Sequence, residues 1–118
     1  MAVTIQDIFE ELLPGRISDD PELRIPAYGS TNTPIIQINA FGEVEGAGPW
    51  IIDLTGESEY VRQGLADKPG CTVEGNASAF ENLWTGELRA VEALGSGELD
   101  VRGSMRLAAF VFAQYYGA

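Results

Sequence analysis

The last segment of the chain limits the possible folds more than any other. Residues 105–116, MRLAAFVFAQYY, have only Arg106, Gln114 and two tyrosine hydroxyls as polar groups. The segment is expected to form a helix about 18 Å long, with apolar side chains in nearly every direction. Because such a helix must be covered on more than one side, we expect it to lie across a sheet. Its outer side would then be covered by protein, by a partner subunit or by an apolar ligand.

Short runs with alternating apolar residues predict the strands of that sheet. The runs at 34–46 and 50–56 are joined by a turn from Gly46 to Pro49, which favours an antiparallel hairpin. Further strands are expected at 59–66, 71–75 and 98–102.

Capping residues and turn residues predict where the first helix begins and ends. Thr4 to Asp7 has the form of a capping sequence, and Pro14 and Gly15 are expected to stop the helix. The apolar positions at helical spacing between them are Ile5, Ile8, Phe9, Leu12 and Leu13. The Pro-, Gly-, Ser- and Asp-rich segment at 16–34 is expected to be a loop.

Two short helices are predicted between the fourth and fifth strands. Ser78 and Glu81 have the spacing of a capping box, and Gly86 is expected to end the helix that follows. A second helix is expected at 88–94, closed by Gly95 and Gly97.

The composition indicates one globular domain spanning residues 1–118. Eighteen acidic residues against seven basic ones give a net charge of −11, which repels phosphate backbones and anionic lipid headgroups. We therefore expect neither nucleic-acid binding nor stable membrane anchoring. No run approaches the roughly 20 apolar residues of a membrane span, and the acidic start is unlike a signal peptide, so a cytoplasmic location is expected.

The sequence lacks most residues that common catalytic and metal sites use. It has no histidine and one cysteine, Cys71, which excludes histidine-based triads, histidine-ligated zinc and an internal disulfide. Cys71 lies in a strand-like run and is expected to be a small buried apolar residue. We expect no metal, no cofactor and no enzymatic activity.

The glycines after residue 85 resemble a family signature. The C-terminal signature of the sterol carrier protein type-2 family is similar to the frame Gly86-x-Leu88, eight residues, Gly97-x-Leu99-x-Val101-x-Gly103, then Met105-x-Leu107-Ala108. Further short segments match the family and follow in the same order along the chain: Leu13-Pro14, Pro49-Trp50 and Cys71-Thr72-Val73. The resemblance covers residues 44–116 well and the N-terminal third loosely.

The resemblance implies an α/β fold of the α+β type, with a five-stranded, mostly antiparallel sheet and helices on one face that enclose an apolar tunnel. Family members bind sterols, fatty acids or fatty acyl-CoA and perform no reaction in this fold. Three positions depart from the family. Glu87 and Glu98 stand where members often carry lysine, and Ala90 replaces a frequent proline. The reversed charge argues against anionic membranes and CoA phosphates as partners, but it leaves an apolar ligand unaffected.

The leading hypothesis is a non-enzymatic carrier that binds, and by extension transfers, a sterol, fatty acid or other apolar molecule in an internal tunnel. Hydrocarbon burial alone can supply micromolar affinity. The candidate lining residues are Trp50, Ile52, Leu54, Phe80, Leu83, Trp84, Leu99, Val101, Met105, Phe110 and Val111.

Two other hypotheses remain open. The first is an interaction module whose apolar C-terminal helix packs on a second copy of the chain or on a lipid-metabolising enzyme. The second is an enzyme that uses Asp53, Glu74 and Glu81 as acid and base, although paired carboxylates need a cleft that the sequence does not show.

Overall fold

The computed structural model describes residues 4–18, 35–54, 60–114 and 116. The side chains at 90, 91, 106, 110, 113 and 114 lie outside this description, and with them the prediction for Phe110. The described residues form one five-stranded sheet of order β3-β2-β1-β4-β5. Its strands are β1 (Ile35–Phe41), β2 (Gly48–Asp53), β3 (Val61–Gln63), β4 (Cys71–Asn76) and β5 (Leu99–Gly103).

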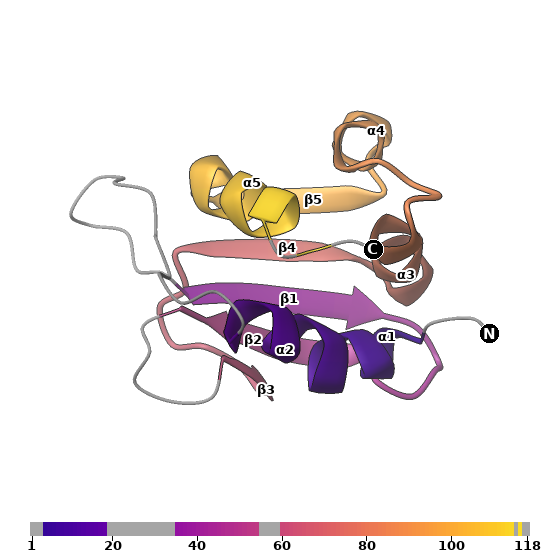
Figure 1. Cartoon of the computed structure of the whole chain (residues 1–118). Helices are drawn as coiled ribbons and strands as arrows, with labels where there is room; N and C mark the ends of the chain where they lie inside the picture. Colours follow the sequence, from indigo (N-terminus) through magenta and orange to yellow (C-terminus); the bar gives the residue numbers. More distant parts are fainter. Residues whose placement is uncertain (1–3, 19–34, 55–59, 115, 117–118) are drawn as a thin grey trace.

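Three of the four strand pairs are antiparallel, and β1 pairs with β4 in parallel. The register aligns Ile36 with Ile52 on β2 and with Cys71 on β4, so apolar side chains line up across one face of the sheet. Helices cover this inner face: α1 and α2 lie over β1 and β2, and α5 lies over β4 and β5 (Figure 1). The predicted mostly antiparallel, five-stranded sheet with helices on one face is confirmed.

The described helical segments are α1 (Ile5–Asp7), the π-helical turn η1 (Ile8–Leu12), α2 (Leu13–Ser18), α3 (Ala77–Thr85), α4 (Ala90–Ser96) and α5 (Met105–Gln114). The capping box at the first of them is confirmed. The Asp7 N–H donates to the Thr4 hydroxyl oxygen at 3.2 Å, and the Thr4 N–H donates to the Asp7 carboxylate at 3.3 Å. Thr4 therefore fixes the residue at which the helical run begins.

The π turn changes which side chains the first helix buries. In η1 the Leu13 N–H donates to the Ile8 carbonyl, five residues back. The wider turn moves the buried side by one position, so Leu13 and Ile17 are fully buried while Leu12 is 37% exposed. The inward position predicted for Leu12 is wrong for this reason.

The expected stop at Pro14 and Gly15 is also wrong, because both residues lie within α2, which runs to Ser18. A proline ring normally obstructs the carbonyl four residues earlier in an α-helix. The π turn directly before Pro14 has already displaced the hydrogen-bond ladder. Gly15 does not take the left-handed conformation that ends a helix. Of the predicted loop at 16–34, the first three residues are helical and the rest lies outside the described residues.

The capping box predicted at Ser78 is wrong. Helix α3 begins at Ala77 after Asn76, so Ser78 lies inside its first turn. The Glu81 carboxylate instead accepts the Ile5 N–H of α1 at 2.8 Å. A residue expected to cap its own helix thus caps a different one and joins the N-terminal helix to α3.

Two glycines of the predicted signature, Gly86 and Gly97, end helices as expected. Gly86 ends α3 and Gly97 ends α4, both with left-handed backbones (φ +90° and +82°). Strand β5 follows, and the Ser104 hydroxyl accepts the Leu107 N–H at 3.2 Å at the start of α5. The helix expected at 88–94 begins two residues later, at Ala90, and runs to Ser96. Gly95 therefore lies inside α4, and its expected role in closing the helix is wrong, because only Gly97 of the two takes the left-handed conformation.

Helix α5 has a buried side and an open side among its described side chains. Leu107, Ala108 and Val111 are buried against the sheet, whereas Met105 is 52% exposed and Ala109 is exposed. Phe112 is half-buried against the core. Cover on more than one side, including the outer side, was expected, but the described part of α5 leaves Met105 and Ala109 open to solvent.

Candidate functional site

A cluster of aromatic rings fills the space between the helices and the inner face of the sheet. Phe9 of η1 stacks on Trp50 of β2, with ring centroids 5.4 Å apart, and it meets Phe80 of α3 edge-on at 6.2 Å. Tyr116, beyond the end of α5, lies 6.2 Å from Phe9 and 5.0 Å from Trp84. Rings from opposite ends of the chain therefore meet in the centre of the molecule.

Tyr116 is held in this cluster by a hydrogen bond as well as by packing. Its hydroxyl donates to the Phe80 carbonyl oxygen at 2.7 Å, and its side chain is buried. Burial raises the pKa of Tyr116 well above the ordinary value of 10, and the nearby charge of Glu81 raises it further. The ring therefore stays neutral and apolar over the whole physiological pH range.

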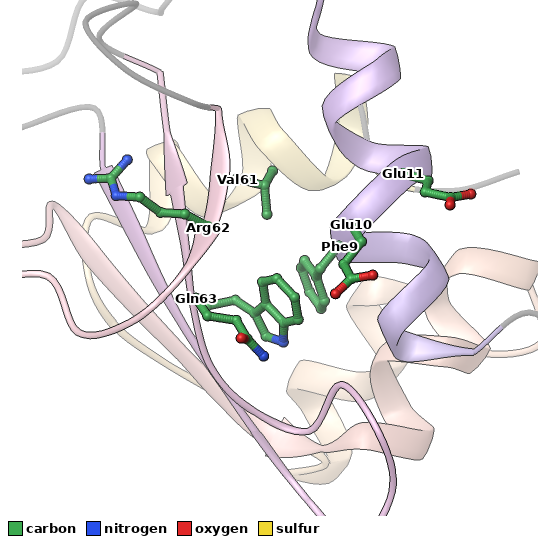
Figure 2. A pocket seen from close by; sticks show the side chains of 7 residues that line it. Phe9, Glu10, Glu11, Val61, Arg62 and Gln63 are labelled. Atoms are coloured by element: carbon green, nitrogen blue, oxygen red, sulfur yellow. The ribbon is translucent and has the colours of Figure 1, made fainter.

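The first cavity beside this cluster lies between η1 and strands β2 and β3. It has a volume of about 450 Å³, and we call it the Trp50 cavity. Its lining residues are Phe9, Glu10, Glu11, Trp50, Val61, Arg62 and Gln63. Figure 2 shows Val61 and Gln63 on the strand side facing Phe9 on the helix, while Glu11 and Arg62 point away to opposite sides. The Glu10 carboxylate remains at the rim.

The tight turn below the Trp50 cavity brings the hairpin against the N-terminal helix. The Trp50 indole N–H donates to the Gly46 carbonyl at 2.6 Å. Gly46 has φ +88°, and a Cβ there would lie 2.6 Å from the Gln6 backbone. Only glycine allows this approach, so the β1–β2 turn sets the position of Trp50 relative to η1.

The second cavity lies between α3, the segment that follows it and the end of α5. It has a volume of about 360 Å³, and we call it the Arg89 cavity. Its lining residues are Leu83, Gly86, Leu88, Arg89, Phe112 and Tyr116. Most of this wall is apolar, with a single cation at the rim. Its volume is within the range of roughly 300–1,000 Å³ that is usual for small-molecule sites.

The three carboxylates considered as acid and base each have a structural partner. Asp53 accepts from the Arg62 guanidinium at 3.0 Å on the outer face of the sheet, and Glu74 accepts from the Asn39 amide at 3.1 Å. Glu81 binds the Ile5 N–H at the helix side. A pair of catalytic carboxylates must converge on one cleft, and these three are instead used in holding strands and helices together.

The predicted lining residues take several positions. The buried members belong to one apolar core and are Trp50, Ile52, Leu54, Phe80, Leu83, Trp84, Leu99 and Val111. Val101 is half-buried against this core, and Met105 is 52% exposed. Trp50 lines one cavity and Leu83 the other. Whether the whole set surrounds a ligand stays a prediction.

Sequence reasoning missed several residues at the cavities. They are Phe9, Leu88, Arg89, Phe112 and Tyr116. Phe9 was placed only on the buried face of a helix, which was correct. Arg89 gave no signal, because an arginine between two predicted short helices is ordinary, and its position beside Phe112 depends on how α5 returns over the sheet.

Cys71 is buried on β4, as expected for a small apolar residue. Burial raises the pKa of its thiol from 9.0 to about 12, so the thiolate that would act as a nucleophile does not form near neutral pH. Among the described residues, no three metal-ligating side chains gather at one place. No described helix is long and apolar enough to cross a membrane.

Comparison with known proteins gives one family and a set of similar folds. Residues 28–111 match the model of the SCP-2 sterol transfer family, and no curated protein matches the chain. The crystal structure of sterol carrier protein 2 like 2 from Aedes aegypti is similar over 92% of this chain and 94% of that one, with 21% identity and a TM-score of 0.68.

Two further structures have the same fold. The first is sterol carrier protein 2 from Aedes aegypti in complex with the C16 fatty acid palmitate (16% identity, 96% of this chain and 94% of that one, TM-score 0.69). The second is a ubiquinone synthesis protein, UbiJ-SCP2 (16% identity, 94% of this chain and 84% of that one, TM-score 0.57).

Proposed function

Because the chain belongs to the SCP-2 sterol transfer family, as its glycine frame predicted, we propose that it is a non-enzymatic binding protein for an apolar, lipid-like molecule. The observation that carries the proposal is the Arg89 cavity, an apolar hollow that opens beside the aromatic cluster. A solved structure with the same fold holds palmitate, which supports a ligand with a long hydrocarbon chain. Transfer of the ligand between membranes or to an enzyme is part of the proposal.

We propose that the ligand reaches the inside of the protein by displacing the Tyr116 ring. Tyr116 lines the Arg89 cavity and Phe9 lines the Trp50 cavity, and these two rings lie 6.2 Å apart. The walls of the two cavities therefore meet at this ring contact. Moving Tyr116 outward would join them into a tunnel, whose proposed wall is the predicted lining set, with Met105 at its solvent edge.

The exposed side of α5 favours a second candidate function. Met105 is half-exposed on this helix and Ala109 is exposed beside it, so a second copy of the chain or a lipid-metabolising enzyme could pack there. In this hypothesis α5 is an interface and does not cover a ligand. It predicts self-association or partner binding that does not depend on lipid.

The test compares Phe112→Asp with Phe41→Asp. Phe112 is half-buried at the Arg89 cavity, whereas Phe41 is 54% exposed at the end of β1. Binding of a fluorescent fatty acid and a fluorescent sterol would be measured, with circular dichroism to check the fold and sedimentation to check the oligomeric state. We expect Phe112→Asp to weaken binding by at least about tenfold, since replacing an apolar wall by a carboxylate forces hydrocarbon of the ligand against a charge and costs well over about 1.4 kcal/mol. Phe41→Asp should bind like the wild type.

A folded Phe112→Asp variant with unchanged affinity for both probes would contradict the proposed site. If that variant instead became monomeric from a dimeric wild type while binding normally, the second candidate would be favoured. Native mass spectrometry of the purified wild type would show directly whether it carries a lipid.

A further inference from the structure

Arg89 lies at the rim of the Arg89 cavity. It is the residue directly before α4, and its carbonyl accepts the Ala93 N–H at 2.9 Å in the first turn of that helix. Its backbone is extended (φ −89°, ψ 145°), and its side chain is exposed. Arg89 therefore lies at the start of a helix, at the edge of an apolar hollow.

Among the described residues, Arg89 forms no ion pair, whereas other arginines do have partners. Arg62 pairs with Asp53, Arg102 pairs with Glu74 and Asp100, and the Arg16 guanidinium lies 4.5 Å from the centre of the Trp84 ring. No described carboxylate forms an ion pair with Arg89. A cation with no ion pair among residues 4–18, 35–54 and 60–114, placed beside apolar walls, is unusual in a protein of net charge −11.

The walls below Arg89 define what kind of molecule would fit. The side chains of Leu83, Leu88 and Phe112 offer hydrocarbon surface, and the Tyr116 ring closes the inner end. A ligand with one anionic group and a long apolar tail would satisfy both features, because guanidinium binds carboxylate with two parallel hydrogen bonds.

We propose that Arg89 binds the carboxylate of an unesterified long-chain fatty acid, and that this contact makes the protein prefer fatty acids to sterols and other neutral lipids. The inference rests on the proposed function of the cavity as the lipid site. A single cation suits a monoanion, whereas the several phosphates of an acyl-CoA would meet the acidic surface that includes the exposed Glu87 and Glu92 nearby in sequence.

The experiment measures the affinity of the full chain for palmitate and for hexadecanol, which have the same tail length and differ at the headgroup. Both ligands displace one neutral fluorescent lipid, and cholesterol is a third ligand. Arg89→Gln is compared with Arg102→Gln, which changes the net charge equally at an exposed site on β5. Arg89→Lys tests whether charge alone suffices.

We expect Arg89→Gln to weaken palmitate binding by about tenfold or more, the effect of losing a charge-assisted hydrogen bond. Its affinity for hexadecanol and cholesterol should stay within about twofold, since hydrocarbon burial is unchanged. Arg102→Gln should bind all three ligands like the wild type, and Arg89→Lys should recover part of the palmitate affinity.

Equal losses for palmitate and hexadecanol in Arg89→Gln would overturn the inference, as would equal palmitate losses in Arg89→Gln and Arg102→Gln. A wild type that binds cholesterol or hexadecanol at least as well as palmitate would also overturn it while leaving the proposed function intact. A wild type that binds none of the three would overturn the proposed function itself.

Discussion

The Trp50 cavity and the Arg89 cavity share a ring contact in their walls, Phe9 with Tyr116, and they differ in the charge at their rims. Both have aromatic rings in their walls, and the Trp50 cavity is the larger (about 450 Å³ against 360 Å³). Glu10 lies at the rim of the Trp50 cavity, with Arg62 turned away toward Asp53. The rim of the Arg89 cavity has a cation without a described carboxylate partner.

The difference shows that volume alone does not identify an entrance for a lipid. Hydrocarbon would gain similar free energy per buried methylene in either cavity. An anionic headgroup, however, is repelled by Glu10 and attracted by Arg89. We therefore assign the headgroup to the Arg89 cavity and the far end of the tail to the Trp50 cavity, and the predictions below test this assignment.

The largest expected effect is on stability, at the Trp50 cavity. Trp50→Ala removes a buried ring, its stacking on Phe9 and its hydrogen bond to Gly46, which should lower the free energy of unfolding by about 3–5 kcal/mol. Urea denaturation measures this loss. A matched Trp84→Ala variant, which removes the ring in contact with Tyr116, should lose a similar amount of stability. A loss below about 1 kcal/mol in Trp50→Ala would mean that the stacking of Trp50 on Phe9 contributes little to stability.

The second effect is a loss of stability at alkaline pH. Burial raises the pKa values of Cys71, to about 12, and of Tyr116, so both groups stay protonated in the folded protein while they ionise in the unfolded chain. Their contribution is complete below about pH 9 and is lost as pH rises through 9 to 12, by at most about 1.4 kcal/mol per pH unit for each group. Urea midpoints at pH 8 to 11 test this, and Cys71→Ala should flatten the fall from pH 9 onward. The prediction would be contradicted if the free energy of unfolding of both Cys71→Ala and Tyr116→Phe fell with pH as steeply as that of the wild type.

The third effect concerns the Tyr116 ring, at which the walls of the two cavities meet. Tyr116→Phe keeps the ring but removes the hydrogen bond to the buried Phe80 carbonyl, and it should cost about 1–2 kcal/mol of stability. If ligand entry requires this ring to move, the same variant should bind palmitate more tightly, by up to about tenfold. Calorimetric titration measures the affinity. Weaker binding in Tyr116→Phe would show that the hydroxyl contacts the ligand. It would contradict the idea that its hydrogen bond to Phe80 only resists the movement of the ring.

The smallest effect is expected at the acidic rim. Glu10→Gln keeps the size of the side chain and its hydrogen-bonding partner Gln6, so stability should change by less than about 0.5 kcal/mol. Palmitate affinity should stay within about twofold, because the headgroup is assigned to the other cavity. A tenfold rise in palmitate affinity would place the carboxylate at Glu10 instead and reverse the assignment.

The strands and the glycine-closed helices could be predicted because their signals are local. The alternation around Ile36 and Ile38 decides which side of β1 is apolar, and Gly86 and Gly97 adopt the left-handed conformation that ends α3 and α4. The resemblance added a five-stranded, mostly antiparallel sheet. The order of its strands and the parallel pair of β1 and β4 were not predicted, because no local pattern specifies them.

The features that could not be predicted depend on contacts between distant residues. Glu81 has the spacing of a local cap, but its carboxylate reaches Ile5, 76 positions away in sequence. The contact of Phe9 with Tyr116 joins the two ends of the chain. Arg89 became a candidate only once α5 had placed Phe112 and Tyr116 beside it. Such contacts are decided by packing over the whole domain, and short-range propensities carry no information about them.

The π turn in the first helix has a consequence for how the chain length can vary. If Glu11, which points away from the Trp50 cavity (Figure 2), were deleted, the buried residues that follow Ile5 would lie 3, 4, 7 and 11 positions after it. This is the spacing of one face of an uninterrupted α-helix, so η1 is equivalent to a single-residue insertion in a regular amphipathic helix. After the deletion, however, the ring of Pro14 would meet the Phe9 carbonyl four positions back. Loss of the inserted residue is therefore expected to be tolerated only together with replacement of the proline.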